Sequence, residues 1–317
     1  MDLRAALRPG PGIHAGAAKS RIIRLQHKPE FTGPPMPALP LSPDQPFNLD
    51  ASLSCGQVFR WDRATDGWWC GVVGEKIIKI RQDGDTLTFR GAPASFIRHY
   101  FSLDTDLDAV LGSFDCDDFI HASVIRNRGL RLVRQPAWEC TASYICATNS
   151  NIPTIRRRIA AIAKRYGKPI EFEGETYYTF PEPEVIACGG HDGLTECRLG
   201  YRQPYVFGTS CTVTRAEVWE RKVRKLPYEE ARNEVMKLHG IGPKAADCIL
   251  LFAFQKYEAF PVDVWIRRIM QEHYLPDLAT GAPLTSREYD TIRRFAREHF
   301  GEYCGWAQEY LFAGREG

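Results

Sequence analysis

The chain has 317 residues, of which 44% are hydrophobic and 12% aromatic, enough to bury a sizeable core in one large domain or in two to three smaller ones. Its 41 Lys and Arg residues nearly balance its 39 Asp and Glu residues, so the net charge of +2 does not by itself argue for a nucleic-acid partner. No stretch approaches the roughly 18 consecutive apolar residues of a membrane span, so we expect no spanning helix and no membrane partner.

The chain opens with residues 1–45, which are rich in Pro, Gly and Ala and predict a flexible tail. Residues 46–120 then predict an antiparallel β domain, because short β-type runs alternate there with Asp-Gly turns at 66–67 and 83–84. The predicted strands are QVFRW (57–61), WWCGVV (68–73), KIIKI (76–80) and TLTF (86–89).

Residues 121–317 have helical periodicity and predict a mainly α-helical domain. Within it, residues 169–199 carry Gly, Pro and acidic residues that break the pattern, so we predict a long loop there. The expected fold class is therefore α+β, with the antiparallel sheet first and the helices after it.

Cysteine usage bears on the cellular location and on metals. The ten cysteines lack the spacing of a secreted disulfide framework and no signal peptide precedes them, so we expect reduced thiols inside a cell. Cys188, Cys197 and Cys211 are too loosely spaced for a zinc ribbon, and Cys304 stands alone. We predict no metal centre.

One helical pair stands out. The stretches YEEARNEVMKLH (228–239) and PKAADCILLFAFQ (243–255) predict two helices joined by Gly240, Ile241 and Gly242, whose glycines permit a tight reversal. Pro243 suits the first helical position. Backbone N–H groups at such a helix start can bind a nucleic-acid phosphate whatever the base sequence. The alternative is a purely structural corner between two helices.

Lys244 follows directly, at a helix start where a cation is disfavoured by roughly 0.3–1 kcal/mol. We expect this field, helped by burial, to lower the pKa of the lysine and to leave a neutral, nucleophilic amine. Nineteen residues later Asp263 precedes another predicted helix, where it would serve as the N-cap. An aspartate in that position is usually structural, so only its combination with the hairpin and the lysine suggests catalysis.

This combination resembles the helix-hairpin-helix Gly/Pro-Asp superfamily of DNA glycosylases. The chain lacks the four closely spaced C-terminal cysteines of the iron–sulfur members, and Lys244 separates it from alkylpurine members that only remove the base. From about residue 47 to 312 it resembles the 8-oxoguanine DNA glycosylase/lyase subfamily, through the further motifs SCGQVFRW (54–61), ICATNSNI (145–152), LGYRQPYV (199–206) and CGWAQEYLF (304–312).

The resemblance implies a bifunctional DNA glycosylase/AP lyase of base excision repair, in which the helical domain 121–317 is the helix-hairpin-helix catalytic domain and has two lobes with the active site between them. Such an enzyme flips 8-oxoguanine out of duplex DNA, excises it through a lysine Schiff base and cleaves the strand by β-elimination. Lys244 would be the nucleophile, and Asp263 would stabilise the positive charge that develops on the sugar. The expected partner is double-stranded DNA containing an oxidised purine, with no metal or organic cofactor, and we expect a monomer located with DNA inside the cell.

The resemblance also implies a base pocket. The carbonyl of Gly56 would accept a hydrogen bond from the N–H that the oxidised base carries where guanine has an acceptor. Gln308 would bond the Watson–Crick edge, and Phe312 and Cys248 would pack against the two faces of the base. Trp265 stands where better-studied members have histidine, which implies a pocket wall that is either widened or reshaped.

A third set of residues would handle the opened duplex. Asn149 corresponds to the residue that fills the space of the extruded nucleotide, Tyr201 to the wedge and Arg202 to the reader of the orphaned cytosine. Thr154 replaces a second cytosine-reading arginine, which predicts relaxed selectivity for the partner base. Two alternatives remain open: a glycosylase for another damaged purine, and a helix-hairpin-helix protein that binds DNA without catalysis.

Overall fold

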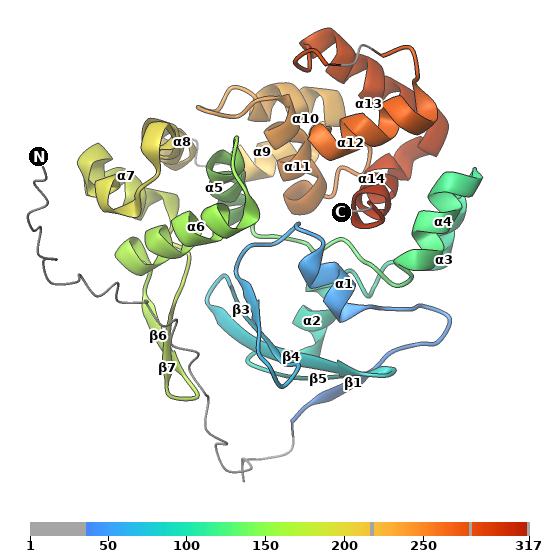
Figure 1. Cartoon of the computed structure of the whole chain (residues 1–317). Helices are drawn as coiled ribbons and strands as arrows, with labels where there is room; N and C mark the ends of the chain where they lie inside the picture. Colours follow the sequence, from blue (N-terminus) through green and yellow to red (C-terminus); the bar gives the residue numbers. More distant parts are fainter. Residues whose placement is uncertain (1–35, 216–218, 279–280, 316–317) are drawn as a thin grey trace, which may run out of the picture. The chain divides into compact units, whose positions relative to one another are not determined.

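The computed structural model describes residues 36–215, 219–278 and 281–315, and Figure 1 shows the order of their elements. The first part is a five-stranded antiparallel sheet in the order β1-β5-β4-β3-β2. Its strands are β1 Ala38–Pro40, β2 Trp61–Arg63, β3 Trp69–Val73, β4 Lys76–Asp83 and β5 Thr86–Arg90.

The buried face of this sheet carries β-branched and aromatic side chains that pack against α1 (Leu49–Ser54) and α2 (Ala94–Tyr100). Trp61 is buried, and its indole Nε1 donates to the Tyr100 hydroxyl over 2.9 Å, which satisfies the polar atom that burial would otherwise leave unpaired. The sheet domain therefore has its own apolar core, in agreement with the predicted order of sheet and helices.

Two sequence-based boundaries shift. Strand β1 pairs with β5 (Ala38 opposite Thr88), so the folded chain already begins within the stretch predicted as a tail, of which residues 1–35 lie outside the described residues. The predicted strand 57–61 is wrong except for its last residue. The Gln57 side chain is buried and bonds both the Val133 N–H and the Arg131 carbonyl, so the start of this segment is tied to residues 131–133. Before Trp61, a backbone bond to the sheet runs from the Val72 N–H to the Arg60 carbonyl, over 3.4 Å.

The remainder is mainly helical (Figure 1). The α-helices are α3 Leu107–Phe114, α4 Asp118–Arg126, α5 Ala137–Ala147, α6 Ile152–Tyr166, α7 Pro183–Gly193, α8 Gln203–Arg215, α9 Trp219–Lys225, α10 Tyr228–Val235, α11 Pro243–Phe254, α12 Val264–Ile269, α13 Ser286–Phe300 and α14 Cys304–Ala313. Shorter turns are η1 Thr195–Cys197, η2 Gly200–Arg202, η3 Met270–Tyr274 and η4 Gly301–Tyr303.

Helices α5 and α11 pack against each other at the centre of the helical core. Every residue of α11 from Ala245 to Phe254 is buried, as is most of α5, and helices that are apolar on all sides belong in a core. The predicted α+β fold is confirmed. The predicted boundary between the two domains at residue 120 stays a prediction. Helix α3 lies before that residue and packs into the helical core.

The predicted loop 169–199 is wrong for most of its length. It forms a hairpin of β6 (Pro169–Phe172) and β7 (Glu175–Tyr178), followed by α7. The turn residues Glu173 and Gly174 both have positive φ, 50° and 82°, which is the geometry of a two-residue hairpin turn. Among the described residues, no helix combines the length and the apolar character needed to cross a membrane.

Candidate active site

The hairpin between α10 and α11 has the predicted local geometry. Gly240 has φ +79°, and a Cβ there would lie 2.6 Å from the Tyr205 ring, so both conformation and space require glycine. The Ile241 side chain is buried and anchors the turn in the core, while Gly242 is the N-cap of α11 and Pro243 its first residue. The N-terminus of α11 therefore sits at the end of a fixed, tight turn, with Lys244 in its first turn.

Lys244 is half-buried, with its Nζ 5.2 Å from the centre of the Tyr144 ring. Burial alone would lower the pKa of its ammonium, but the acidic groups of Cys248, Asp263 and Glu309 outweigh burial and leave that pKa raised. Burial also raises the pKa of the Cys248 thiol to about 12, so near neutral pH the carboxyl groups are the relevant partners. The prediction of a lowered lysine pKa is wrong for the DNA-free protein.

Asp263 caps α12 as predicted. Its Oδ1 accepts hydrogen bonds from the backbone N–H groups of Trp265 (3.0 Å) and Ile266 (2.9 Å). These bonds fix the carboxylate at the start of the helix, and its charge is felt at Lys244. The two residues proposed for catalysis therefore belong to one electrostatic cluster.

A buried network connects the backbone around these two residues. Asp247, one turn after Lys244, accepts hydrogen bonds from the Tyr289 hydroxyl (2.6 Å) and from Tyr228 (2.7 Å), and it pairs with Arg232 at 3.0 Å. The Tyr289 oxygen in turn accepts from the N–H of Val262, the residue before Asp263, over 3.3 Å. Tyr289 on α13 thus bridges α11 to the segment that carries Asp263.

Gly56 and Phe312 lie together. A Cβ on Gly56 would be 3.6 Å from the Phe312 ring, and the φ of +104° at Gly56 disfavours any other residue. Gln308 is 4% exposed, and its Oε1 has no hydrogen-bond partner among the described residues, as for a group kept for a ligand. Cys248 is buried one turn beyond Lys244. These features fit a base pocket, and its assignment stays a prediction.

Trp265 lines a different cavity from the other residues of the predicted base pocket. It is 39% exposed and lines a cavity of about 510 Å³ between α4, α12 and the end of α14, together with Arg126, Arg268 and Arg315. Gly56, Cys248, Gln308 and Phe312 do not line this cavity. The guanidinium of Arg315 lies 3.7 Å from the centre of the Phe312 ring, so it covers one face of the ring that we predict to stack on a base.

Asn149, Tyr201 and Arg202 form a second cluster. Asn149 is exposed with φ +47°, and its amide donates to the Tyr201 hydroxyl over 3.4 Å. Tyr201 is 51% exposed, whereas Arg202 is 4% exposed and donates to the carbonyl groups of Thr148 and Asn149. Tyr201 is free to contact DNA as it stands, while Arg202 must release these carbonyls before it can read a base.

Sequence reasoning missed Glu309. This residue is 5% exposed on α14, beside Gln308, and its Oε2 has no hydrogen-bond partner among the described residues. Burial raises the pKa of its carboxyl to about 7, although Cys55 and Lys244 act against that rise. The available signal was a glutamate directly after Gln308, which is already assigned to the pocket, in a helix of mainly apolar residues.

Comparison with known proteins identifies the family. The model of the 8-oxoguanine DNA glycosylase N-terminal domain matches residues 39–141. A probable N-glycosylase/DNA lyase of Methanothermobacter thermautotrophicus is 33% identical over 267 residues, which cover 74% of this chain and 81% of that protein. The chain belongs to the 8-oxoguanine DNA glycosylase/lyase family.

Other members of this glycosylase family agree in sequence and in structure. The N-glycosylase/DNA lyase of Arabidopsis thaliana is 27% identical over 280 residues, covering 84% of this chain and 76% of that protein. The Clostridium acetobutylicum 8-oxoguanine glycosylase/lyase, solved with double-stranded DNA that has cytosine opposite 8-oxoguanine, superposes with a TM-score of 0.78 at 32% identity, over 84% of this chain and 91% of that one. A 3-methyladenine DNA glycosylase of Archaeoglobus fulgidus, at 20% identity and a TM-score of 0.70, shares the fold.

Proposed function

We propose that this protein is a bifunctional DNA glycosylase/AP lyase that excises 8-oxoguanine from duplex DNA and then nicks the strand. The observation that carries the proposal is the placement of Lys244 in the first turn of α11, directly after the hairpin, and of Asp263 at the N-cap of α12, in a chain whose relatives are named N-glycosylase/DNA lyases. Its partner is double-stranded DNA with an oxidised purine, and it acts as a monomer wherever the cell keeps its DNA.

The chemistry begins with an extruded nucleotide, because a base inside a duplex cannot reach Lys244. Tyr201 enters the stack and Asn149 fills the space that the nucleotide leaves, at an unstacking cost of a few kcal/mol. The hairpin turn at 240–242 holds the backbone phosphates on the N-terminus of α11. Arg202 then exchanges the Thr148 and Asn149 carbonyls for the orphaned base.

Excision follows from the lysine and the carboxylate. The Lys244 amine attacks the anomeric carbon as the base departs with the electron pair of the glycosidic bond, and Asp263 stabilises the positive charge on the sugar. The sugar ring opens to a Schiff base, and β-elimination from that imine expels the 3′-phosphate. Since the pKa of the lysine is raised in the free protein, its ammonium must lose a proton before the attack.

Lesion choice rests on Gly56 in this proposal. Its carbonyl attracts the N–H of the oxidised purine and repels the acceptor that guanine has at the same point. Gln308 has a carboxamide oxygen left for the Watson–Crick edge, and Phe312 supplies the stacking face once the Arg315 guanidinium leaves it. One backbone oxygen thus carries most of the discrimination.

Borohydride trapping on an 8-oxoguanine:cytosine duplex tests the proposal. We expect a covalent adduct with the wild type and none with Lys244→Gln. The matched control is Lys237→Gln, which removes another hairpin lysine, one that is exposed and paired with Glu234 at 2.7 Å, and should keep the adduct. An adduct only on duplexes with other damaged purines would transfer the proposal to those lesions. DNA binding without any adduct would leave a non-catalytic helix-hairpin-helix protein.

A further inference from the structure

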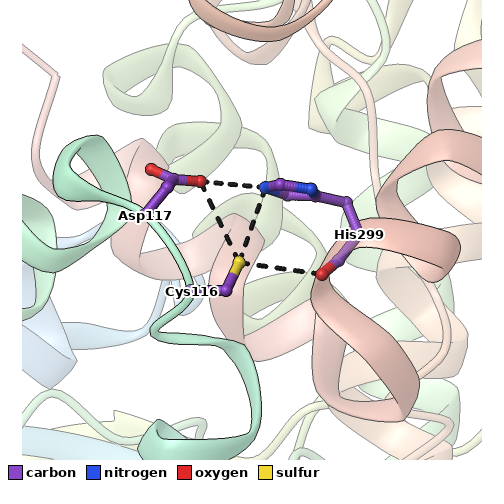
Figure 2. Close-up of side chains that lie close together, drawn as sticks. All are labelled: Cys116, Asp117 and His299. Atoms are coloured by element: carbon purple, nitrogen blue, oxygen red, sulfur yellow. Dashed lines mark hydrogen bonds and ion pairs between the residues drawn. The ribbon is translucent and has the colours of Figure 1, made fainter.

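Cys116, Asp117 and His299 come together away from the hairpin. Cys116 and Asp117 lie in the turn that leads into α4, and His299 lies near the end of α13 (Figure 2). The Cys116 Sγ is 3.5 Å from the His299 Nε2 and 3.9 Å from the Asp117 Oδ2, and the last two atoms are 2.9 Å apart. Thiolate, imidazole and carboxylate are all zinc ligands.

These separations match a tetrahedral ion. Bond lengths of about 2.0–2.3 Å to sulfur, nitrogen and oxygen place neighbouring ligand atoms about 3.4–3.6 Å apart. The observed triangle deviates from that range by a few tenths of an ångström, which is within the reach of small side-chain rotations. A histidine–aspartate hydrogen bond explains the 2.9 Å contact, and the Cys116 thiol donates weakly to the His299 carbonyl (3.7 Å) and to Asp117 (3.9 Å), so the three ligand atoms already converge without an ion (Figure 2).

The three side chains are held in advance. Asp117 Oδ1 caps α4 through the N–H groups of Phe119 (2.9 Å) and Ile120 (3.0 Å), and this leaves Oδ2 turned toward His299. The imidazole of His299 stacks on Phe295 at 5.1 Å and contacts Tyr274 edge-on at 5.4 Å. Because carboxylate and ring are both fixed, an ion would lose little to side-chain ordering.

We propose that Cys116, Asp117 and His299 form a zinc site with a water molecule in the fourth position. The exposed thiol loses its proton to solvent on binding, the neutral imidazole binds through Nε2, and the two anionic ligands balance the charge of the ion. A soft thiolate with an imidazole selects Zn²⁺ or Co²⁺ over Mg²⁺. The ion would tie the start of α4, a wall of the 510 Å³ cavity, to α13.

Metal titration of the full chain tests this site without reference to DNA. We expect one Zn²⁺ per chain by calorimetry, with proton release, and a thiolate-to-metal charge-transfer band when Co²⁺ is used instead. Zinc at about 100 times its Kd should raise Tm by about 4 °C. Mg²⁺ should neither bind stoichiometrically nor raise Tm.

Cys116→Ser should weaken zinc binding about tenfold or more and abolish the cobalt band. The matched control is Cys188→Ser, which removes another exposed cysteine and should bind as the wild type does. Asp117 is a poor target because it also caps α4. Absence of stoichiometric zinc from the wild type, or equal binding by Cys116→Ser, would overturn the site.

A different observation, the unpaired buried carboxyl oxygen of Glu309, bears on the proposed reaction. The titratable and charged groups that face Glu309 come from every neighbouring element: Cys55 after α1, Tyr144 of α5, Lys244 and Cys248 of α11, Asp263 at α12 and Arg315 after α14. A buried oxygen without a hydrogen-bond partner is costly and rare, and the Glu309 carboxyl also influences Lys244 electrostatically, so its presence calls for a use.

We infer that Glu309 accepts the proton that Lys244 must lose, an inference that rests on the proposed function. An N–H bond of the ammonium breaks, an O–H bond forms on Oε2 directly or through one water, and the lone pair of the amine becomes available to the anomeric carbon. Burial raises the pKa of Glu309 to about 7, which suits a group that must take up and release a proton near neutral pH.

The single-turnover excision rate of the wild type should rise with pH while Glu309 ionises and level off above about 7. Glu309→Gln keeps the shape and removes the acceptor, so we expect the inflection to vanish and the plateau to fall about 100-fold. Glu139→Gln is the control, because the Glu139 side chain is only 15% exposed but pairs with Arg60 at 3.3 Å. An active wild type with an unchanged Glu309→Gln profile would sink this inference alone, whereas an inactive wild type would sink the proposed function.

Discussion

The cluster around Lys244 and the cluster around Tyr201 differ in how far they are prepared for DNA. Lys244 and Asp263 lie on elements fixed by a glycine turn, a helix cap and the buried Asp247–Tyr289 network. Tyr201 and Asn149 are exposed, and the hydrogen bonds of the Tyr201 hydroxyl are long, 3.3–3.4 Å. The Arg202 guanidinium lies 4.2 Å from the centre of the Tyr201 ring and donates to the Asn149 carbonyl over 3.2 Å. The groups proposed to act on the sugar lie on fixed elements, while Tyr201 and Asn149, proposed to open the duplex, are exposed to solvent.

Preorganisation makes sense for the first cluster, because electrostatic stabilisation acts best when its dipoles and charges need no rearrangement during the reaction. The second cluster must accept a duplex of variable shape, which favours exposed side chains. Mutations in the cluster around Lys244 should therefore mainly lower the excision rate. Mutations in the cluster around Tyr201 should mainly lower the affinity for duplex DNA.

The largest expected effect is on the rate. Asp263→Asn keeps an N-cap oxygen for Trp265 and Ile266, so α12 should stay intact, but it removes the negative charge beside the sugar. We expect single-turnover excision to fall about 100- to 1000-fold with unchanged affinity for a duplex that contains a stable abasic analogue. Retained turnover with a folded protein would remove the role assigned to Asp263.

The local features around Lys244 and Asp263 could be predicted from the sequence. The Gly240–Gly242 turn, the start of α11 at Pro243 and the capping role of Asp263 each follow from residues within a few positions of one another. The predicted loop 169–199 failed because a hairpin turn of Glu173 and Gly174 lacks the usual Asn-Gly or Asp-Gly signal.

Contacts between residues far apart in the sequence could not be predicted from local patterns. Tyr289 joins Asp247 to Val262 across 42 and 27 residues, and the charge of Lys244 depends on groups from three helices. The pKa of Lys244 is raised by Cys248, one turn along the same helix, and by Asp263 and Glu309, and the two carboxyl groups come near the lysine only in the folded chain.

Tyr289→Phe tests whether the first cluster depends on its network. It removes the hydroxyl that donates to Asp247 and accepts from Val262, and it leaves the ring in place. A hydrogen bond to a charged buried group contributes about 1.5–3 kcal/mol, so the free energy of unfolding in urea should fall by that amount. The excision rate should fall about tenfold, since the Asp263 segment loses its tether. Loss of stability at an unchanged rate would show that the network supports the fold but not the catalytic geometry.

Tyr201→Ala should have the smallest effect on the protein itself. Its ring is half exposed, and its hydrogen bonds to Thr148 and Asn149 are long, so the free energy of unfolding should change by less than about 0.5 kcal/mol. A wedge that stacks on a base contributes about 1–3 kcal/mol, so affinity for the lesion duplex should fall about tenfold. Measured on single-stranded DNA, where no stack has to be opened, the same variant should bind as the wild type does. If affinity for both substrates drops together, Tyr201 is a general DNA contact, and the opening of the duplex must be assigned to Asn149 or Arg202.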